Sequence, residues 1–126
     1  MIALFDTNIL IDHLKGKREA LLVLQNCLHT KILLACSVIT RIEILSGMRP
    51  GEEGKLEGFL AGFKKIEVTD KIAGLAGIYL QEYRKSHGVN MADAIIAASA
   101  RESGSKLYTL NAKHYPMRDI EIVKPY

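Results

Sequence analysis

Hydrophobic and polar positions along the chain fall into blocks that predict strands and helices in turn. Short, continuous apolar runs that stop at polar clusters are typical of buried strands, whereas apolar residues spaced three or four apart indicate amphipathic helices. Such apolar runs predict strands at residues 1–5, 31–36, 66–68 and 106–110, with a weak fifth at 120–123. Helical spacing is found at residues 9–14, 19–28, 42–46, 52–63, 70–85 and 91–101.

This order of elements predicts an α/β fold. Strands that alternate with one or two helices form a parallel sheet covered by helices on both faces. We therefore expect a single three-layer α/β/α domain over residues 1–126, with a central parallel sheet of four to five strands. The first two helical patterns form one helix, unless Gly16 breaks it. The pattern at 70–85 has an apolar stripe that can pack in the core or against a second copy of the chain: Ile72, Leu75, Ile78 and Tyr79.

The composition excludes several classes of protein. A chain of 126 residues that is 48% hydrophobic and 25% charged is typical of one globular domain, and disorder is not expected. No apolar run approaches the ~18 residues of a membrane span, and the first residues lack a signal peptide's basic segment, so we expect a cytoplasmic protein. Cys27 and Cys36 lack zinc-ligand spacing and are expected to be buried free thiols. The net charge of +3 is compatible with a nucleic acid partner.

Three carboxylates stand where the predicted elements meet. Asp6 ends the first strand, and Glu43 and Asp93 lie at the starts of two predicted helices. Taken singly, each is explained by helix capping, because Thr40 with Glu43 and Asn90 with Asp93 fit capping boxes, and Asp6 can accept hydrogen bonds from the amides of the next turn. Taken together, they indicate a site, because a parallel α/β winding can bring all three to one edge of the sheet, where ligands bind.

The chemistry of three clustered acids points to a metal ion. Carboxylates without an interleaved Lys or Arg repel one another unless a cation lies among them. Oxygen ligands suit Mg²⁺, or alternatively Mn²⁺, better than zinc. Glu43 and Asp93 would be kept ionised by the positive ends of their helices if they lie in first turns. Phosphoryl transfer is the reaction that best matches carboxylate-held Mg²⁺.

Four segments resemble, in order and spacing, the PIN domain. They are residues 5–11 (FDTNILI), 37–47 (SVITRIEILSG), 91–97 (MADAIIA) and 108–111 (YTLN). The length of the chain is similar to that of the VapC-type toxin ribonucleases of toxin-antitoxin pairs. The resemblance implies a Mg²⁺-dependent endoribonuclease, the toxin of a type II pair, which cleaves structured RNA such as tRNA or rRNA by metal-activated water and leaves 5′-phosphate and 3′-hydroxyl ends. It also implies a small antitoxin partner and a homodimer.

The resemblance further implies roles for individual residues. Four positions match the catalytic set of the family: Asp6, Glu43, Asp93 and Asn111. The first three would bind the metal, and Thr7 or Asn8 would orient Asp6 or a water. Asn111 is an amide where many members have an acid, which leaves open whether one or two metal ions bind. The four histidines lack ligand spacing and are expected to be surface or packing residues; His114 alone is placed to reach this edge.

Basic side chains near these motifs are candidates for contact with RNA phosphates. They are Lys15, Lys17, Arg18 and Arg41. Solvated surface charge is the better explanation of each of them when it is considered singly.

Two other functions remain open at the level of sequence. A strand that ends in Asp also begins the phosphohydrolases that use an aspartyl nucleophile, although those enzymes usually have a second acid where this chain has Asn8. A non-catalytic binding module of the same fold is the other alternative, with acids that only cap helices and hold loops. Stabilisation by Mn²⁺ or Mg²⁺ would distinguish a clustered acid site from separate capping acids.

Overall fold

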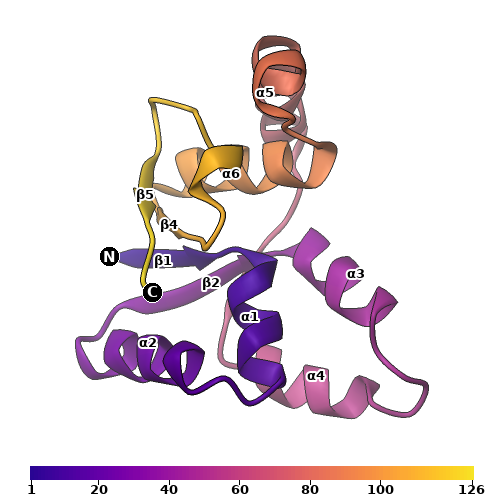
Figure 1. The fold of residues 1–126 in the computed structure, drawn as a ribbon, viewed down its shortest axis with the longest axis vertical. Helices are drawn as coiled ribbons and strands as arrows, with labels where there is room; N and C mark the ends of the chain where they lie inside the picture. Colours follow the sequence, from indigo (N-terminus) through magenta and orange to yellow (C-terminus); the bar gives the residue numbers. More distant parts are fainter.

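A five-stranded parallel sheet lies between two layers of helices in a computed structural model that describes residues 1–126 (Figure 1). The strands, in chain order, are β1 (Ile2–Phe5), β2 (Leu33–Ser37), β3 (Lys64–Ile66), β4 (Lys106–Tyr108) and β5 (Glu121–Val123). Their order across the sheet is β3-β2-β1-β4-β5, and every neighbouring pair is parallel. The predicted α/β/α fold is therefore confirmed.

The helices divide between the two faces of the sheet. They are α1 (Thr7–Leu14), α2 (Arg18–His29), α3 (Val38–Ser46), α4 (Glu53–Leu60), α5 (Asp70–His87) and α6 (Met91–Ser103), followed by a short 3₁₀ helix (Ala112–His114). In Figure 1, α5 and α6 cover the upper face, and α1, α2 and α4 cover the lower face. Leu4 packs into the core on the α5–α6 side, whereas Ala3 and Phe5 pack into the core on the other side. Both faces of β1 are covered, which explains its continuous apolar run.

The chain breaks into two helices at Gly16. This residue has a φ of 84°, a left-handed conformation that glycine adopts without steric cost. The Gly16 amide donates to the His13 carbonyl at 2.9 Å, and the Lys17 amide donates to the Asp12 carbonyl at 2.9 Å, which closes α1. The pattern after β1 therefore forms α1 and α2 rather than one helix.

The start of α3 differs from the predicted one. The Ser37 hydroxyl accepts a hydrogen bond from the Ile39 amide at 3.2 Å and caps the helix, which begins at Val38 rather than at residue 42. Glu43 consequently lies in the second turn, and the predicted capping box between Thr40 and Glu43 is wrong. Val38 and Ile39 in this first turn are as apolar as the preceding strand, so the sequence pattern did not identify Ser37 as the N-cap of α3.

Two strands are displaced from their predicted positions. β3 spans Lys64–Ile66 rather than 66–68, because Lys64 pairs with Ala35 of β2 at the edge of the sheet, where polar side chains are tolerated. β2 begins at Leu33 rather than at residue 31, because Lys31 has a φ of 60° in the turn that ends α2.

The apolar stripe on α5 does not form one exposed face. Ile72 and Tyr79 are each only 3% exposed, so of the two alternatives that the sequence left open for these residues the structure supports packing in the core. Ile78 is 50% exposed and remains available to a partner. No helix is long and apolar enough to cross a membrane.

Candidate active site

Asp6 lies at the carboxyl end of β1, where α1, α3 and α6 begin (Figure 1). Its side chain is 7% exposed and caps α1 by accepting a hydrogen bond from the Thr7 amide to Oδ1 at 2.8 Å. The other oxygen, Oδ2, accepts hydrogen bonds from the Thr109 hydroxyl at 2.8 Å and from the Tyr115 hydroxyl at 2.9 Å. β1 and β4 pair with Phe5 opposite Tyr108, which brings Thr109 beside Asp6.

Asp93 reaches the same place from the first turn of α6. It forms a capping box with Asn90, as predicted: the Asp93 amide donates to Asn90 Oδ1 at 2.8 Å, and the Asn90 amide donates to Asp93 Oδ2 at 3.3 Å. The Tyr115 hydroxyl lies 3.4 Å from Asp93 Oδ1 and therefore connects this acid to Asp6. Capping and participation in a shared site are compatible at this residue.

Glu43 joins the site through Thr7. The Thr7 hydroxyl donates to Glu43 Oε1 at 2.6 Å and lies 3.0 Å from the Thr40 hydroxyl. Glu43 is an exposed residue, whereas Thr7 and Thr40 are buried. Thr7, which was predicted to orient Asp6 or a water, thus contacts two of the three acids, one through its amide and one through its hydroxyl.

Asn111 and His114 form a pair beside Asp93. Asn111 Nδ2 lies 2.8 Å from His114 Nδ1, and that ring nitrogen lies 3.5 Å from Asp93 Oδ2. His114, expected to be a surface or packing residue, therefore contacts two residues of the site. Asn8, in the first turn of α1, has a buried Oδ1 atom with no hydrogen-bond partner.

The site carries negative charge that the protein does not neutralise with Lys or Arg. None of the ion pairs formed by Lys or Arg includes Asp6, Glu43 or Asp93. Burial raises the pKa of Asp6, the hydrogen bonds from Thr109, Tyr115 and Thr7 lower it, and the nearby Asp93 raises it further. Burial also raises the pKa of Tyr115, and the acids around it add to this effect, so its hydroxyl stays protonated and acts as a donor.

The donor chemistry of the site fits a hard divalent cation. The groups available are carboxylate oxygens without a Lys or Arg partner, and such oxygens are preferred by Mg²⁺ and Mn²⁺. No group of three or more His, Cys, Asp or Glu side chains is placed to hold a metal ion as it stands. Hydroxyl groups instead connect the acids, through Tyr115 and Thr7.

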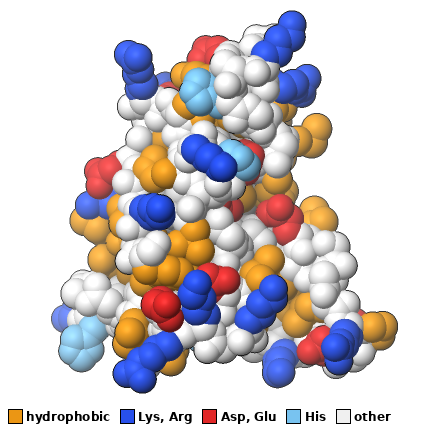
Figure 2. All heavy atoms as spheres, viewed as in Figure 1, with side chains coloured by type: hydrophobic (Ala, Val, Ile, Leu, Met, Phe, Trp, Pro, Cys, Tyr) orange, Lys and Arg blue, Asp and Glu red, His pale blue; other side chains and the backbone are white.

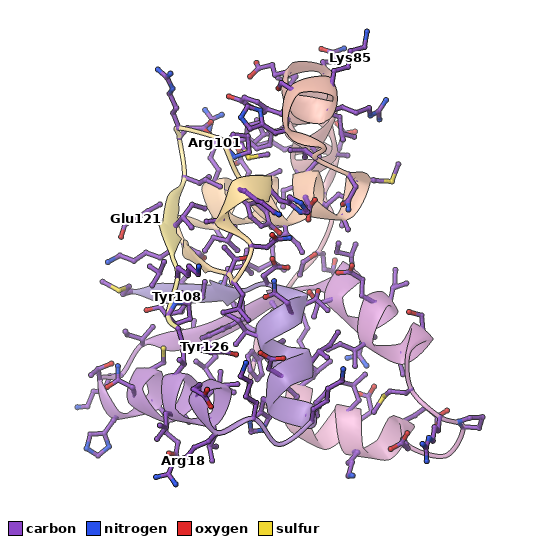
Figure 3. The ribbon with its side chains drawn as sticks, viewed as in Figure 1. Arg18, Lys85, Arg101, Tyr108, Glu121 and Tyr126 are labelled. Carbon is purple, nitrogen blue, oxygen red and sulfur yellow. The ribbon has the colours of Figure 1, made fainter.

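The basic residues predicted to contact RNA are spread over different environments. Arg41 forms an ion pair with Glu57, and Lys17 lies 3.7 Å from Asp12 and over the ring of Tyr126. Arg18 is exposed and lies along the lower edge of the molecule, well away from the end of β1 (Figure 3). Lys15 lines a cavity together with Glu43. Figure 2 shows Lys and Arg side chains along the lower helices and near the tip of α5.

That cavity lies between α1, α3 and α4 and is adjacent to the acid site. It is lined by apolar, basic and acidic residues: Ile11, Leu14, Lys15, Glu43, Ile44, Gly47, Met48, Glu52 and Lys55. Four of these residues are hydrophobic and two are lysines, so the cavity presents both apolar and basic side chains beside Glu43.

Three residues that contact the site were not predicted as site residues from the sequence. Thr109 and Tyr115 contact Asp6, and Thr40 contacts Thr7. Thr109 could have been predicted from its position, because it directly follows the strand β4, just as Asp6 directly follows β1. Nothing in the sequence distinguishes Tyr115 from the other four tyrosines.

The fold and the acid site together define a PIN domain. The model of the PIN domain family matches residues 3–119, and the chain belongs to this family. Among curated relatives, ribonuclease VapC19 of Mycobacterium tuberculosis is 36% identical over 115 residues, which cover 90% of this chain and 92% of the relative. Ribonuclease VapC10 of the same organism is 37% identical over 123 residues, which cover 97% of this chain and 90% of the relative.

Solved structures agree with this assignment. A chain of a toxin-antitoxin complex from Klebsiella pneumoniae is 33% identical, with a TM-score of 0.79 and 98% of each chain covered. A chain of DNA-bound VapBC from Salmonella typhimurium has a TM-score of 0.82 at 24% identity and covers 100% of this chain and 99% of its own, which supports the fold. Membership of the PIN family argues against the aspartyl-nucleophile phosphohydrolase.

Proposed function

We propose that this protein is a metal-dependent endoribonuclease and the toxin of a type II toxin-antitoxin pair. The observation that carries this proposal is that Asp6, at the carboxyl end of β1, is connected to Glu43 through Thr7 and to Asp93 through Tyr115. None of these three acids has a Lys or Arg partner. Its relatives named as ribonucleases, VapC19 and VapC10, support the choice of RNA as substrate.

Mg²⁺, with Mn²⁺ as a substitute, would be held by Asp6, Asp93 and Glu43. When bound, a divalent cation supplies activation of a water and neutralisation of charge at a phosphodiester. The remaining residues of the site orient these acids: Thr7 binds Glu43, Thr109 and Tyr115 bind Asp6, and the pair of Asn111 and His114 lies against Asp93. Asn111 brings an amide oxygen but no charge.

Structured RNA, such as tRNA or rRNA, is the proposed substrate class. Lys15 and Lys55 would contact phosphates of a bound strand, and their position in the lining of the cavity beside Glu43 supports this proposal. The other three basic residues are less suited to contact RNA at this site. Arg41 and Lys17 already form ion pairs with acidic side chains, and Arg18 lies far from the acids (Figure 3).

A small antitoxin and a second copy of the chain are the proposed protein partners. The solved structure of a similar chain in a toxin-antitoxin complex supports the antitoxin partner. The hydrophobic residues that line the cavity beside Glu43 would offer a surface for this partner. The exposed Ile78 on α5 supports the second. Light scattering would test the homodimer by measuring the molar mass of the protein in solution. We expect the mass of a dimer for the wild type and a larger fraction of monomer for Ile78→Asp.

The test of the function is cleavage of total RNA by purified, antitoxin-free protein. Mg²⁺ or Mn²⁺ should support cleavage and EDTA should abolish it, and both Asp6→Asn and Asp93→Asn should reduce cleavage to background. Asp119→Asn is the matched control, because Asp119 lies outside the site and is held by Arg101. Absence of cleavage, together with no effect of metal on thermal stability, would favour the non-catalytic binding module instead.

A further inference from the structure

The hydrogen bonds around Asp6 are unequally divided between its two oxygens. An ionised carboxylate has about four acceptor positions, two on each oxygen. Thr109 and Tyr115 donate to Oδ2, whereas only the Thr7 amide donates to Oδ1. Oδ2 is therefore saturated, and the remaining acceptor position belongs to Oδ1.

The Tyr115 hydroxyl is fixed by the fold and not by the acids. Tyr115 is 3% exposed and packs with Met117 in the core beneath α5 and α6. Its backbone amide donates to the Ala112 carbonyl at 3.0 Å. Two residues later, Met117 is also 3% exposed in this core, so that the segment is held against α5 and α6. The hydroxyl is thus held at a defined point before any ligand arrives.

We propose that Tyr115 is a positioning residue whose hydroxyl, by binding Oδ2 of Asp6, turns the carboxylate so that Oδ1 is the oxygen offered to a divalent cation. Its second contact, 3.4 Å from Asp93 Oδ1, sets the separation of the two acids. This inference rests on the proposed metal-dependent function. Tyr115 does not itself bind the cation.

The chain provides a matched control for this hydroxyl. Tyr79 is also 3% exposed and also donates to a carboxylate, that of Asp119, at 2.8 Å. Tyr115→Phe and Tyr79→Phe therefore each remove one buried hydroxyl bound to one carboxylate. They differ in the carboxylate: that of Asp6 is buried and belongs to the acid site, whereas that of Asp119 is partly exposed, lies outside the site and is paired with Arg101.

Direct binding of Mn²⁺ by the metal-free protein, followed through the electron paramagnetic resonance of free Mn²⁺, tests the proposal. Groups that orient a metal ligand typically contribute roughly 10- to 100-fold in affinity. We expect Tyr115→Phe to raise the dissociation constant about tenfold or more and Tyr79→Phe to change it less than about twofold. RNA cleavage by Tyr115→Phe should need correspondingly more Mn²⁺ and should recover at saturation.

Several results would overturn the proposal. Equal Mn²⁺ affinity in Tyr115→Phe and the wild type would refute the positioning role while leaving the nuclease intact. Equal weakening by both tyrosine variants would show that loss of stability, and not orientation of Asp6, is responsible. A wild type that neither binds Mn²⁺ nor cleaves RNA would refute the proposed function and this inference with it.

A second measurement keeps the proposal testable if Tyr115→Phe does not fold. Mn²⁺ should perturb the tyrosine absorption of the wild type through Tyr115, and the perturbation should persist in Tyr79→Phe. An unchanged tyrosine spectrum at saturating Mn²⁺ would contradict the contact between this hydroxyl and the metal-binding acid.

Discussion

Two carboxylates in this protein accept a hydrogen bond from a buried tyrosine, yet they are neutralised in different ways. Asp119 binds Tyr79 at 2.8 Å and also has an arginine partner, Arg101, at 2.7 Å. Asp6 binds Tyr115 at 2.9 Å, but no Lys or Arg approaches it, and Asp93 adds a second negative charge. The first arrangement is complete within the chain. The second has unbalanced charge, which is the property expected of a site for an external cation.

The largest expected difference between the surroundings of Asp6 and those of Asp119 is in RNA cleavage. Asp6→Asn and Asp93→Asn should each lower RNA cleavage by more than about 100-fold, because loss of a direct metal ligand should exceed the 10- to 100-fold cost of losing an orienting group. Asp119→Asn should stay near the wild type. Single-turnover cleavage of a defined RNA would measure all three. Comparable losses in all three variants would erase the distinction between the regions.

The second largest difference is expected in how strongly Mn²⁺ stabilises variants of Asp6 and of Asp119. Binding of a ligand to the folded state at about 100 times its dissociation constant stabilises that state by about 2.7 kcal/mol. For a domain of this size we expect Mn²⁺ to raise the melting temperature of the wild type by roughly 5–14 °C, since each 1 kcal/mol corresponds to about 2–5 °C. Asp119→Asn should respond like the wild type, whereas Asp6→Asn should not respond. A response that survives in Asp6→Asn would place the metal elsewhere.

A smaller effect, on the stability of the fold, is expected when the contact of Asp119 with Tyr79 or Arg101 is broken. Tyr79→Phe removes a buried hydrogen bond to a charged group and should lower the free energy of unfolding by about 1.5 kcal/mol. Arg101→Gln should also destabilise the protein. Urea unfolding of the metal-free proteins would measure both. If these variants also lost affinity for Mn²⁺, Asp119 would have to be regarded as part of the metal site.

The smallest expected effect is a dependence of stability on pH that originates at Asp6. Its pKa is raised above the ordinary value of 3.8. Between that value and the raised pKa, the folded state holds a proton that the unfolded state has released, so this contribution to stability falls as pH rises through the window. Melting temperatures of metal-free wild type and Asp6→Asn, measured from the ordinary value toward neutrality, should diverge in favour of the variant as pH rises. Parallel curves would indicate that Asp6 ionises without penalty.

Much of the fold could be predicted because both faces of the sheet are covered. Full burial makes β1 a continuous apolar run, and its stop at Asp6 is visible without a structure. β3 was misplaced because an edge strand has less need of apolar residues, so the pattern favoured Val68 over Lys64. The beginning of α3 was missed because its first turn is as apolar as the strand before it.

Local patterns in the sequence were enough to predict the class of fold and the three acids, because parallel strands end at one edge of the sheet. The surroundings of Asp6, by contrast, depend on how the chain packs. Thr109 and Tyr115 lie 103 and 109 residues away along the chain. The pairing of β4 with β1 and the packing of Tyr115 in the core bring their hydroxyls to Oδ2. Contacts between such distant residues depend on packing in three dimensions, and no local pattern in the chain encodes them.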